Sequence, residues 1–597
     1  MKPFVRNLLA VILGIAIMWI VGFLIVTGLV TSAVASMDAK PQVPSGSVLV
    51  LDMSAIHIAE QSSDVPAGAD ALLGGSMGQT VGLWDAIDGI ITAAYDPGIC
   101  CLYVKPDGAD CGISGLEELR SALTLFRQSG KPVVAYIQNP SNGSMYLGSA
   151  ADKFFMTSDH GSTSTFVGVA GQMLYLKDLL DRLGVHVQLI RHGQYKSAGE
   201  MFIRSSSSPE NREQNLAMVR SIWATVSREI AAARVIDPAE LDRLVDGLLL
   251  NVPEDFLATG LVDGLKDKNA MTDYLCRMAD VSDAKDLSLV ALGDYLQART
   301  LSDGRSGWKI ALIFADGEIV DTPESGSVSG DAWADLIDSV RRDDSVKAVV
   351  FRVNSPGGSV LASSKIKDAM EMLCEAKPVI ASYGDYAASG GYWISCGCKE
   401  IYSDATTLTG SIGVFSMIPD LSATTQDLLH VGVETIGSGP HSDMYSMMRP
   451  LDTAELQYLQ DSVEDIYERF VALVADGRNL SEDFVDSVAQ GRVWTGAEAK
   501  EIGLVDKIGT LQDALYRAAF LSGGPEDFLS WQVVQYPAKE TMMDVLNSLL
   551  GDSAAKPTVR MLLSGTPFEG LSSAFDALTV KDPSRVYARL PYAIDIH

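Results

Sequence analysis

Positive charge, histidine and long apolar runs are all scarce in this sequence. Lysine and arginine number 46 against 76 aspartates and glutamates, and the formal net charge is −30. Because phosphate binding requires a positively charged face, and none is evident, this balance argues against a nucleic-acid-binding protein. The sequence also lacks a long low-complexity tract. With 47% hydrophobic residues over 597 positions, it is typical of several globular domains and not of a disordered chain.

Cysteines are few and odd in number. The seven are Cys100, Cys101, Cys111, Cys276, Cys374, Cys396 and Cys398. In an exported protein some of them can pair, but the odd count leaves at least one free. No second Cys/His pair stands at zinc-finger spacing from Cys396 and Cys398, so we predict that the cysteines are structural. We expect neither a metal site nor a cofactor.

A single long apolar run stands near the N-terminus. Leu8–Val30 carries no charge, and its 23 residues would form a helix of about 35 Å, enough for a bilayer core of about 30 Å. Small residues over Thr31–Ser36 resemble the cleavage site of a signal peptide, but the run exceeds the 7–15 residues of a signal peptide's apolar core. We expect a retained transmembrane helix. Lys2 and Arg6 precede it, which predicts a cytoplasmic N-terminus and an outer location for everything after it.

The chain contains an internal repeat. Lys131–Tyr136 resembles Lys377–Ser382 at an offset of 246 positions, and Gly260–Asp263 recurs as Gly503–Asp506 at an offset of 243. Several ordered matches at nearly one offset indicate that one unit was duplicated.

Each copy alternates short apolar runs with stretches of helical periodicity. In the second copy the expected strands are 308–314, 347–353 and 378–382, and the expected helices are 331–342, 363–373 and 451–478. Strands separated by helices of 10–15 residues indicate parallel sheet with right-handed crossovers. The sequence therefore predicts an α/β fold built twice.

These patterns divide the chain into five parts. We predict a cytoplasmic stub, transmembrane helix and tether over 1–44, a first domain over 45–300, a polar, glycine-rich linker over 301–307, a second domain over 308–535, and a C-terminal extension over 536–597.

Two glycine-rich turns follow strands in the second copy. One is Asn354–Gly358, and the other, Ala387–Gly391, places Ser389 between a strand and a helix. A helix N-terminus favours developing negative charge, and the backbone amides of Gly358 and Gly390 can form an oxyanion hole. The alternative is an ordinary N-cap serine.

A serine nucleophile needs a base, and the second copy supplies no evident one. Lys196, in the first copy, can serve if burial lowers its pKa. Gly143 takes the place of Ser389 in the first copy, and no lysine stands between Val433 and Arg449 in the second. Each copy lacks what the other has, which favours one site shared between them.

Four motifs, when they occur together in one chain, are specific for one protein family. They are Gly193–Ala198, Asn354–Ser359, Gly384–Ile394 and Leu408–Val414. With these motifs the sequence resembles the long form of the signal peptide peptidase A family, in the Clp-protease/crotonase superfamily, over roughly 45–535. The resemblance implies two tandem Clp-protease/crotonase-like domains. The sequence departs from the family in its several cysteines, and the resemblance weakens after residue 536.

The resemblance also implies a function and a site. Ser389 would be the nucleophile, Lys196 the general base, and Ser411 a hydrogen-bond partner of that lysine. Members of the family are membrane-tethered homotetramers that degrade residual signal peptides. We therefore expect a serine endopeptidase that acts on hydrophobic peptides, anchored in the lipid of the bacterial cytoplasmic membrane by Leu8–Val30, with its domains on the periplasmic side.

Three other interpretations remain open from the sequence. A crotonase-like acyl-CoA enzyme would use the same glycines to hold an enolate, and an inactive scaffold would only bind membrane proteins. A Ser–His–Asp triad would need a histidine near Ser389, and His160, His192 and His441 lie in loops near the motifs.

Overall fold

The computed structural model describes residues 41–61, 79–299, 308–324, 326–524, 530–539 and 586–589. Within these ranges no helix is both long and apolar enough to cross a membrane. The predicted transmembrane run Leu8–Val30 and the predicted linker 301–307 lie outside the described residues.

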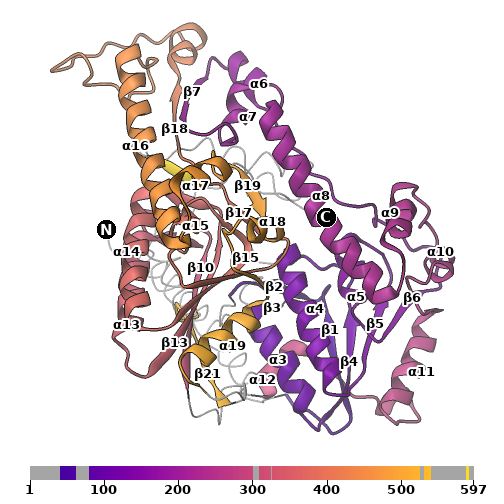
Figure 1. Cartoon of the computed structure of the whole chain (residues 1–597). Coiled ribbons are helices and arrows are strands. Elements are labelled where there is room, and N and C mark those ends of the chain that lie inside the picture. Colours follow the sequence, from indigo (N-terminus) through magenta and orange to yellow (C-terminus); the bar gives the residue numbers. More distant parts are fainter. Residues whose placement is uncertain are drawn as a thin grey trace, which may run out of the picture.

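Each half of the chain forms its own largely parallel sheet (Figure 1). The first sheet has the order β8 (Gly264–Lys266), β6 (Lys153–Thr157), β5 (Val133–Ile137), β4 (Ile99–Lys105), β1 (Ser47–Asp52) and β9 (Leu289–Ala291). The second has the order β19 (Val493–Thr495), β17 (Leu408–Gly410), β15 (Val379–Ala388), β13 (Val346–Ser355), β10 (Lys309–Asp316) and β21 (Gln532–Tyr536), with β16 (Glu400–Ser403) beside β15 and β20 (Lys507–Ile508) beside β16. Only the β17–β19 pair among these is antiparallel.

Helices connect and cover these strands, as the predicted α/β alternation requires. In the first half they are α3 (Leu83–Tyr95), α4 (Ile113–Gln128), α5 (Asn142–Gly148), α6 (Lys177–Arg182), α7 (Glu200–Ile203), α8 (Pro209–Arg234), α9 (Pro238–Asp246), α10 (Pro253–Ala258), α11 (Lys268–Met278) and α12 (Leu292–Ala298). In the second they are α13 (Gly330–Arg342), α14 (Val360–Ala376), α15 (Gly390–Trp393), α16 (Thr453–Arg478), α17 (Glu482–Val488), α18 (Gly496–Glu501) and α19 (Leu511–Leu521). A short parallel pair, β2 (Ile56–Ala59) and β3 (Gln79–Gly82), precedes α3.

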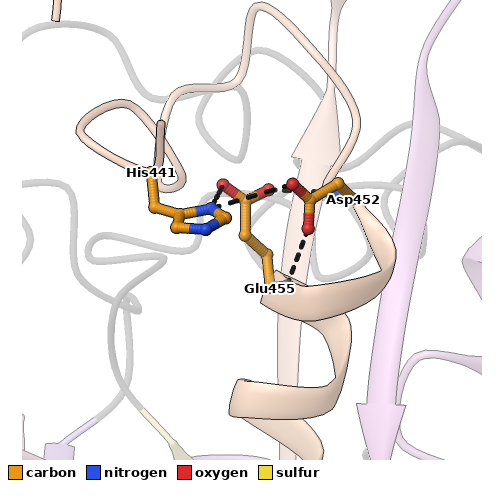
Figure 2. A group of neighbouring side chains, drawn as sticks. All are labelled: His441, Asp452 and Glu455. Atoms are coloured by element: carbon orange, nitrogen blue, oxygen red, sulfur yellow. Dashed lines mark hydrogen bonds and ion pairs between the residues drawn. The ribbon is translucent and has the colours of Figure 1, made fainter. Parts of the chain in front are cut away.

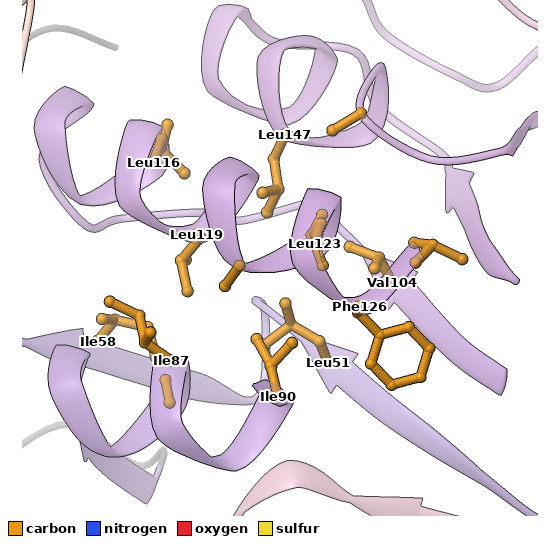
Figure 3. Close-up of a cluster of buried hydrophobic side chains, with 14 of the residues drawn as sticks. Leu51, Ile58, Ile87, Ile90, Val104, Leu116, Leu119, Leu123, Phe126 and Leu147 are labelled. Atoms are coloured by element: carbon orange, nitrogen blue, oxygen red, sulfur yellow. The ribbon is translucent and has the colours of Figure 1, made fainter. Parts of the chain in front are cut away.

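The core of the first half forms where α3 and α4 pack on the sheet. Figure 3 shows Ile87 and Ile90 of α3 facing Leu119 and Leu123 of α4, with Leu51 of β1 beside Ile90. All five side chains are buried. The spacing of three or four residues on each helix places these side chains on one face, which is why the two helices bury this face.

The internal repeat reappears as repeated polar contacts. The Asp263 carboxylate accepts a backbone N–H of β6 at 2.8 Å, and Asp506 accepts one of β16 at 2.7 Å. Arg234 ends α8 and pairs with Asp263, while Arg478 ends α16 and pairs with Asp506. The same framework of polar contacts, a carboxylate that binds both a strand N–H and an arginine at a helix end, therefore recurs in both halves.

A third sheet joins the halves. Its order is β12 (Ser327–Ser329), β11 (Glu318–Val320), β14 (Gly357–Ser359), β22 (Tyr587–Arg589), β18 (Phe415–Asp420) and β7 (His186–Arg191). β7 comes from the first half and pairs antiparallel with β18 of the second. β22 comes from the predicted C-terminal extension and lies between β14 and β18. A division of the chain near residue 300 therefore does not separate two self-contained units.

Buried charges also bridge the two halves. The fully buried guanidinium of Arg352, on β13, donates to Glu60 at 3.0 Å and to Glu118 of α4 at 2.9 Å. Glu117 accepts backbone N–H groups of Ala405 and Thr406. Because removing one partner would leave a buried charge unpaired, this contact fixes how the halves dock.

Candidate active site

Ser389 lies in a strained turn between β15 and α15. Its φ of +57° and ψ of −113° form a combination that residues other than glycine rarely adopt. The N–H of Ser389 donates to the Gly410 carbonyl at 2.8 Å, and its carbonyl accepts the Trp393 N–H at 2.8 Å. β17 and the first turn of α15 thus hold the serine where its side chain is fully buried.

Lys196 reaches Ser389 from the other half of the chain. It lies between β7 and α7, and its Nζ is 2.8 Å from the Ser389 Oγ. The same Nζ is 3.0 Å from the Ser411 Oγ and 3.1 Å from the Ser411 carbonyl oxygen. The pairing of β7 with β18 brings the lysine into the second half, because β18 begins four residues after Ser411.

Burial sets the charge of this lysine. Lys196 is fully buried, and this desolvation lowers its pKa well below the usual value. Within the described residues no carboxylate forms an ion pair with it. Two glycines line its stem, since a Cβ on Gly491 would lie 2.5 Å from the Lys196 Cβ and one on Gly413 would lie 3.3 Å from its Cδ. The amine is therefore kept from water and favours its neutral form.

A neutral amine fits the three contacts of Lys196. It has two N–H groups and one lone pair, whereas the charged form has three N–H groups and no acceptor. The two N–H groups match the two oxygens of Ser411, and the lone pair is then left for the Ser389 hydroxyl proton. This arrangement can remove a proton from the serine.

Several residues that the sequence gave no reason to select hold the lysine segment. The Arg191 Nη1 donates to the Lys196 carbonyl at 2.5 Å and pairs with the buried Glu200 at 3.2 Å. Gln214 of α8 donates to the Tyr195 carbonyl at 3.1 Å. Each is an ordinary polar residue on a helix or strand, so no motif singles it out.

The two predicted oxyanion donors lie side by side. A Cβ built on Gly390 would be 3.0 Å from the Gly358 nitrogen, and one built on Gly357 would be 2.6 Å from the Gly390 nitrogen. Side chains at these positions would fill the space that both amides face, so glycine keeps that space open. Gly390 directly follows Ser389, which places this space beside the serine hydroxyl.

The histidines of a possible triad lie elsewhere. His160 contacts Glu254 at 3.1 Å in an exposed position, and the ring of His192 stacks on Tyr467 with centroids 3.8 Å apart. Among the described residues, Lys196 is the basic side chain that hydrogen-bonds Ser389. This geometry disfavours a histidine-based triad.

His441 belongs to a separate cluster with Asp452 and Glu455 at the start of α16 (Figure 2). Its Nδ1 is 3.0 Å from a Glu455 oxygen. Arg449 donates to both oxygens of Glu455, at 2.7 and 2.8 Å, and these bonds lower the pKa of Glu455 to about 2. Because a guanidinium already binds the oxygens that a metal ion would need, we interpret the cluster as a charged helix cap.

The seven cysteines, all within the described residues, are unpaired. The Cys396 side chain is fully buried, and burial raises its pKa to about 12. A thiol with such a pKa is unreactive near neutral pH, in keeping with a structural role.

The structure thus brings together five residues that the sequence singled out: Ser389, Lys196, Ser411, Gly358 and Gly390. A nucleophile, a neutral base and two adjacent amides are the parts that acyl transfer needs. The geometry is compatible with the predicted roles, and the roles themselves stay predictions.

Comparison with known proteins points to the same chemistry. The model of peptidase family S49 matches twice, over 125–282 and 371–523, and the Clp protease model matches 318–408. Protease 4 of Salmonella typhi is 36% identical over 527 residues, covering 85% of this chain and 83% of its own length. Protease 4 of Haemophilus influenzae is 31% identical over 95% of this chain and 94% of its own. The chloroplastic serine protease SPPA of Arabidopsis thaliana is 31% identical over 72% of this chain and 64% of its own.

Proposed function

The chain belongs to peptidase family S49 and is a serine peptidase, and we propose that it is a membrane-anchored endopeptidase with a Ser389–Lys196 dyad that degrades residual signal peptides. The observation that carries the proposal is the 2.8 Å contact between the Lys196 amine and the Ser389 hydroxyl in a fully buried site.

The proposed reaction is peptide hydrolysis through an acyl-enzyme. Neutral Lys196 takes the Ser389 proton while the Ser389 Oγ attacks a peptide carbonyl carbon. The amides of Gly358 and Gly390 donate to the oxyanion, and Lys196 gives the proton to the leaving amine. Water then attacks the ester, with Lys196 again as base, and restores the serine. Ser411 positions Lys196 throughout, since both of its oxygens accept hydrogen bonds from the amine.

The surroundings of the dyad favour an extended, apolar substrate. The groove between β14 and β18 is as wide as one strand, because β22 fills it as a strand. Along β18 and the lysine segment, Phe202, Phe415 and Met417 form a buried apolar cluster. A peptide bound here would use main-chain hydrogen bonds for affinity and apolar contacts for selection. Folded proteins present no such free strand.

Anchoring and assembly follow from the sequence and are part of the proposal. Leu8–Val30 would hold the chain in the bacterial cytoplasmic membrane, with the catalytic part on the periplasmic side, where spent signal peptides remain. A homotetramer is expected from the resemblance. Exposed apolar residues after β18, among them Leu429, Val431 and Ile436, offer a surface for such an assembly.

The acyl-CoA and scaffold alternatives leave the lysine unexplained. An enolate-stabilising site needs the oxyanion amides but no amine beside a serine. A scaffold has no use for an amine whose burial disfavours its charge.

The substrate assignment can be tested with two peptides of equal length, one an apolar signal-peptide mimic and one polar. The purified full-length protein should cleave the apolar peptide faster, and Ser389→Ala should cleave neither. Equal or faster cleavage of the polar peptide would contradict signal-peptide clearance while leaving the dyad intact. Protease added to intact spheroplasts should degrade the catalytic part, and full protection would contradict the topology.

A further inference from the structure

We propose that a cavity between the two halves binds a small aliphatic diamine or polyamine through the carboxylate of Asp404. The cavity has a volume of about 250 Å³. At about 30 Å³ for each water molecule, it has room for roughly eight of them. The inference goes beyond the proposed function and does not depend on it, because neither Ser389 nor Lys196 is among the described residues that line this cavity.

Both halves form the walls of the cavity. The first half contributes residues of α4 and α8, and the second contributes the residue after β16 and the segment that leads from β20 to α19. The lining residues are Glu117, Arg120, Ser121, Thr124, Glu229, Asp404, Ile508, Gly509 and Thr510. A ligand bound here would contact both halves and would therefore stabilise their docking.

Asp404 has one carboxyl oxygen without a partner. The residue is 2% exposed, and its Oδ2 atom accepts no hydrogen bond from the part of the chain that the structure describes. A buried polar atom without a hydrogen bond is costly, and proteins satisfy such atoms with water, an ion or a ligand. The Oδ2 atom of Asp404 is thus the point at which we expect a donor group of a ligand to bind.

The two nearby arginines are engaged by other groups. Arg352 donates to Glu118 at 2.9 Å, and Arg120 pairs with Glu229 at 3.4 Å. Since the Asp404 Oδ2 atom has no partner among the described residues, neither guanidinium reaches it. The site therefore combines a buried carboxyl group with space for a further positive charge.

The walls favour an organic ammonium ion over a bare metal ion. A metal ion needs several oxygens close together, and among the described residues the acidic groups that approach closely enough to share one are those around His441. Both oxygens of Glu117 already accept backbone N–H groups at 2.9 Å. An ammonium group can bind a single oxygen such as the Asp404 Oδ2 atom, and its alkyl chain can lie against Ile508.

The cavity also offers a place for a second ammonium group. Glu229 lines it with a side chain that is 40% exposed, whereas Asp404 is buried. The hydroxyl of Tyr146 donates to the Glu229 Oε2 atom at 2.7 Å and holds this carboxylate in place. One ammonium group would donate to Asp404 at the buried end and the other would lie near Glu229, which favours a diamine over a monoamine.

Binding should release a proton. Burial and the nearby carboxylates of Glu118 and Glu117 raise the pKa of Asp404 well above its usual value. The other charged or titratable groups around it are Arg120, Glu229, Arg352 and Asp385. Below its raised pKa the free Asp404 is protonated, whereas an ammonium ion favours the carboxylate. The affinity for a diamine should therefore rise with pH, by up to about tenfold per unit below that pKa.

Calorimetric titration of the purified full-length protein with putrescine tests the proposal. The wild type should bind putrescine, and Asp404→Asn should bind it at least about tenfold more weakly, because a charged hydrogen bond is lost. Glu482→Gln removes the same charge from an exposed position on α17 and is the matched control, with unchanged affinity expected. Ser121→Leu keeps every charge but fills the cavity and should also weaken binding. Ser389→Ala should bind like the wild type.

Related ligands separate the possible outcomes. Affinity should decrease from putrescine to butylamine, which has one charge, and to 1,4-butanediol, which has none. If putrescine does not bind, or binds equally to the wild type, Asp404→Asn and Ser121→Leu, the cavity holds only water and the proposal is overturned. Equal binding of butanediol, or tighter binding of Mg²⁺ that Asp404→Asn abolishes, would overturn the ammonium assignment. An affinity that does not rise with pH would overturn the role of Asp404.

Discussion

The two halves of this molecule share a framework and differ at the site. Lys131 donates to the carbonyls of Ala93 and Asp96, and Lys377 donates to those of Val340 and Asp343 in the same way. The pairs Asp263–Arg234 and Asp506–Arg478 repeat likewise. Yet the position of Ser389 in the second half is taken by Gly143 in the first, and among the described residues the buried lysine, Lys196, comes from the first half.

The difference shows which contacts a duplicated fold must keep in each copy. The polar contacts that hold each half together are needed twice, because each half has its own backbone N–H and C=O groups at strand ends that require hydrogen-bond partners. The reactive groups are needed once, provided that the halves dock in a fixed way. β7, paired with β18, and Arg352 of the second half, paired with Glu60 and Glu118 of the first, supply that fixed docking.

The largest effect should come from breaking the shared site. Ser389→Ala and Lys196→Ala should each lower the turnover number for peptide hydrolysis by at least about 10³-fold, and the double variant should be no worse than either, because the pair acts as a unit. Steady-state kinetics with circular dichroism as a folding check would measure this. Ser144→Ala, at the equivalent turn of the first half, is the matched control and should keep full activity. Near-normal turnover in Lys196→Ala would disprove the dyad.

The pH dependence of the rate should report the lysine. Below the lowered pKa of Lys196 the amine is protonated, so the rate should fall about tenfold per pH unit there and level off above that pKa. The pH–rate profile of the wild type, measured from neutral to alkaline pH, locates the rising part of the curve. If the rate rose near pH 6.5 and this rise disappeared on mutating a histidine, a histidine-based triad and not the dyad would explain the activity.

Lysine removal should stabilise the fold at the expense of activity. The folded pKa of Lys196 lies below the unfolded value of 10.5, so the folded state holds fewer protons between these two pH values. The stability of the wild type therefore falls as pH decreases through this window, by up to about 1.4 kcal/mol per unit. Lys196→Met should unfold at higher urea than the wild type, increasingly so as pH is lowered from 10.5. An unchanged difference across pH would mean that the lysine is not buried in solution.

The repeated framework should show equal costs in both halves. Asp263→Ala and Asp506→Ala each remove an acceptor from a strand N–H and from an arginine, and should each cost about 1–3 kcal/mol of unfolding free energy. Urea denaturation compares them. If only one of the two variants lost unfolding free energy, the same contact geometry would contribute differently to the stability of the two halves.

The smallest effect is expected from restoring the serine to the first half. Gly143→Ser in a Ser389→Ala background should stay inactive, because among the described residues the buried lysine is Lys196, which contacts Ser389 and not that turn. Its stability should change by less than about 1 kcal/mol, since better helix propensity offsets a contact of the new Cβ with Leu116 at 3.1 Å. Recovered hydrolysis would mean that the first half holds a base of its own.

The sequence alone determined the alternation of strands and helices and the repeat. The runs 308–314, 347–353 and 378–382 lie within β10, β13 and β15, apart from residues 308 and 378, because buried parallel strands are continuous in their apolar residues. The sequence also selected Ser389 and Lys196, since each copy lacked one of them. These features are local, or follow from comparing two stretches of one chain.

Only the tertiary structure decided how distant segments meet. The pairing of β7 with β18, the charges around Arg352 and the placement of β22 beside the dyad join residues more than 200, 230 and 170 positions apart. No periodicity encodes such contacts, because they depend on which edges and buried charges remain unsatisfied once each half has folded. The lowered pKa of Lys196 is of the same kind, since water is excluded from the amine only when both halves enclose it.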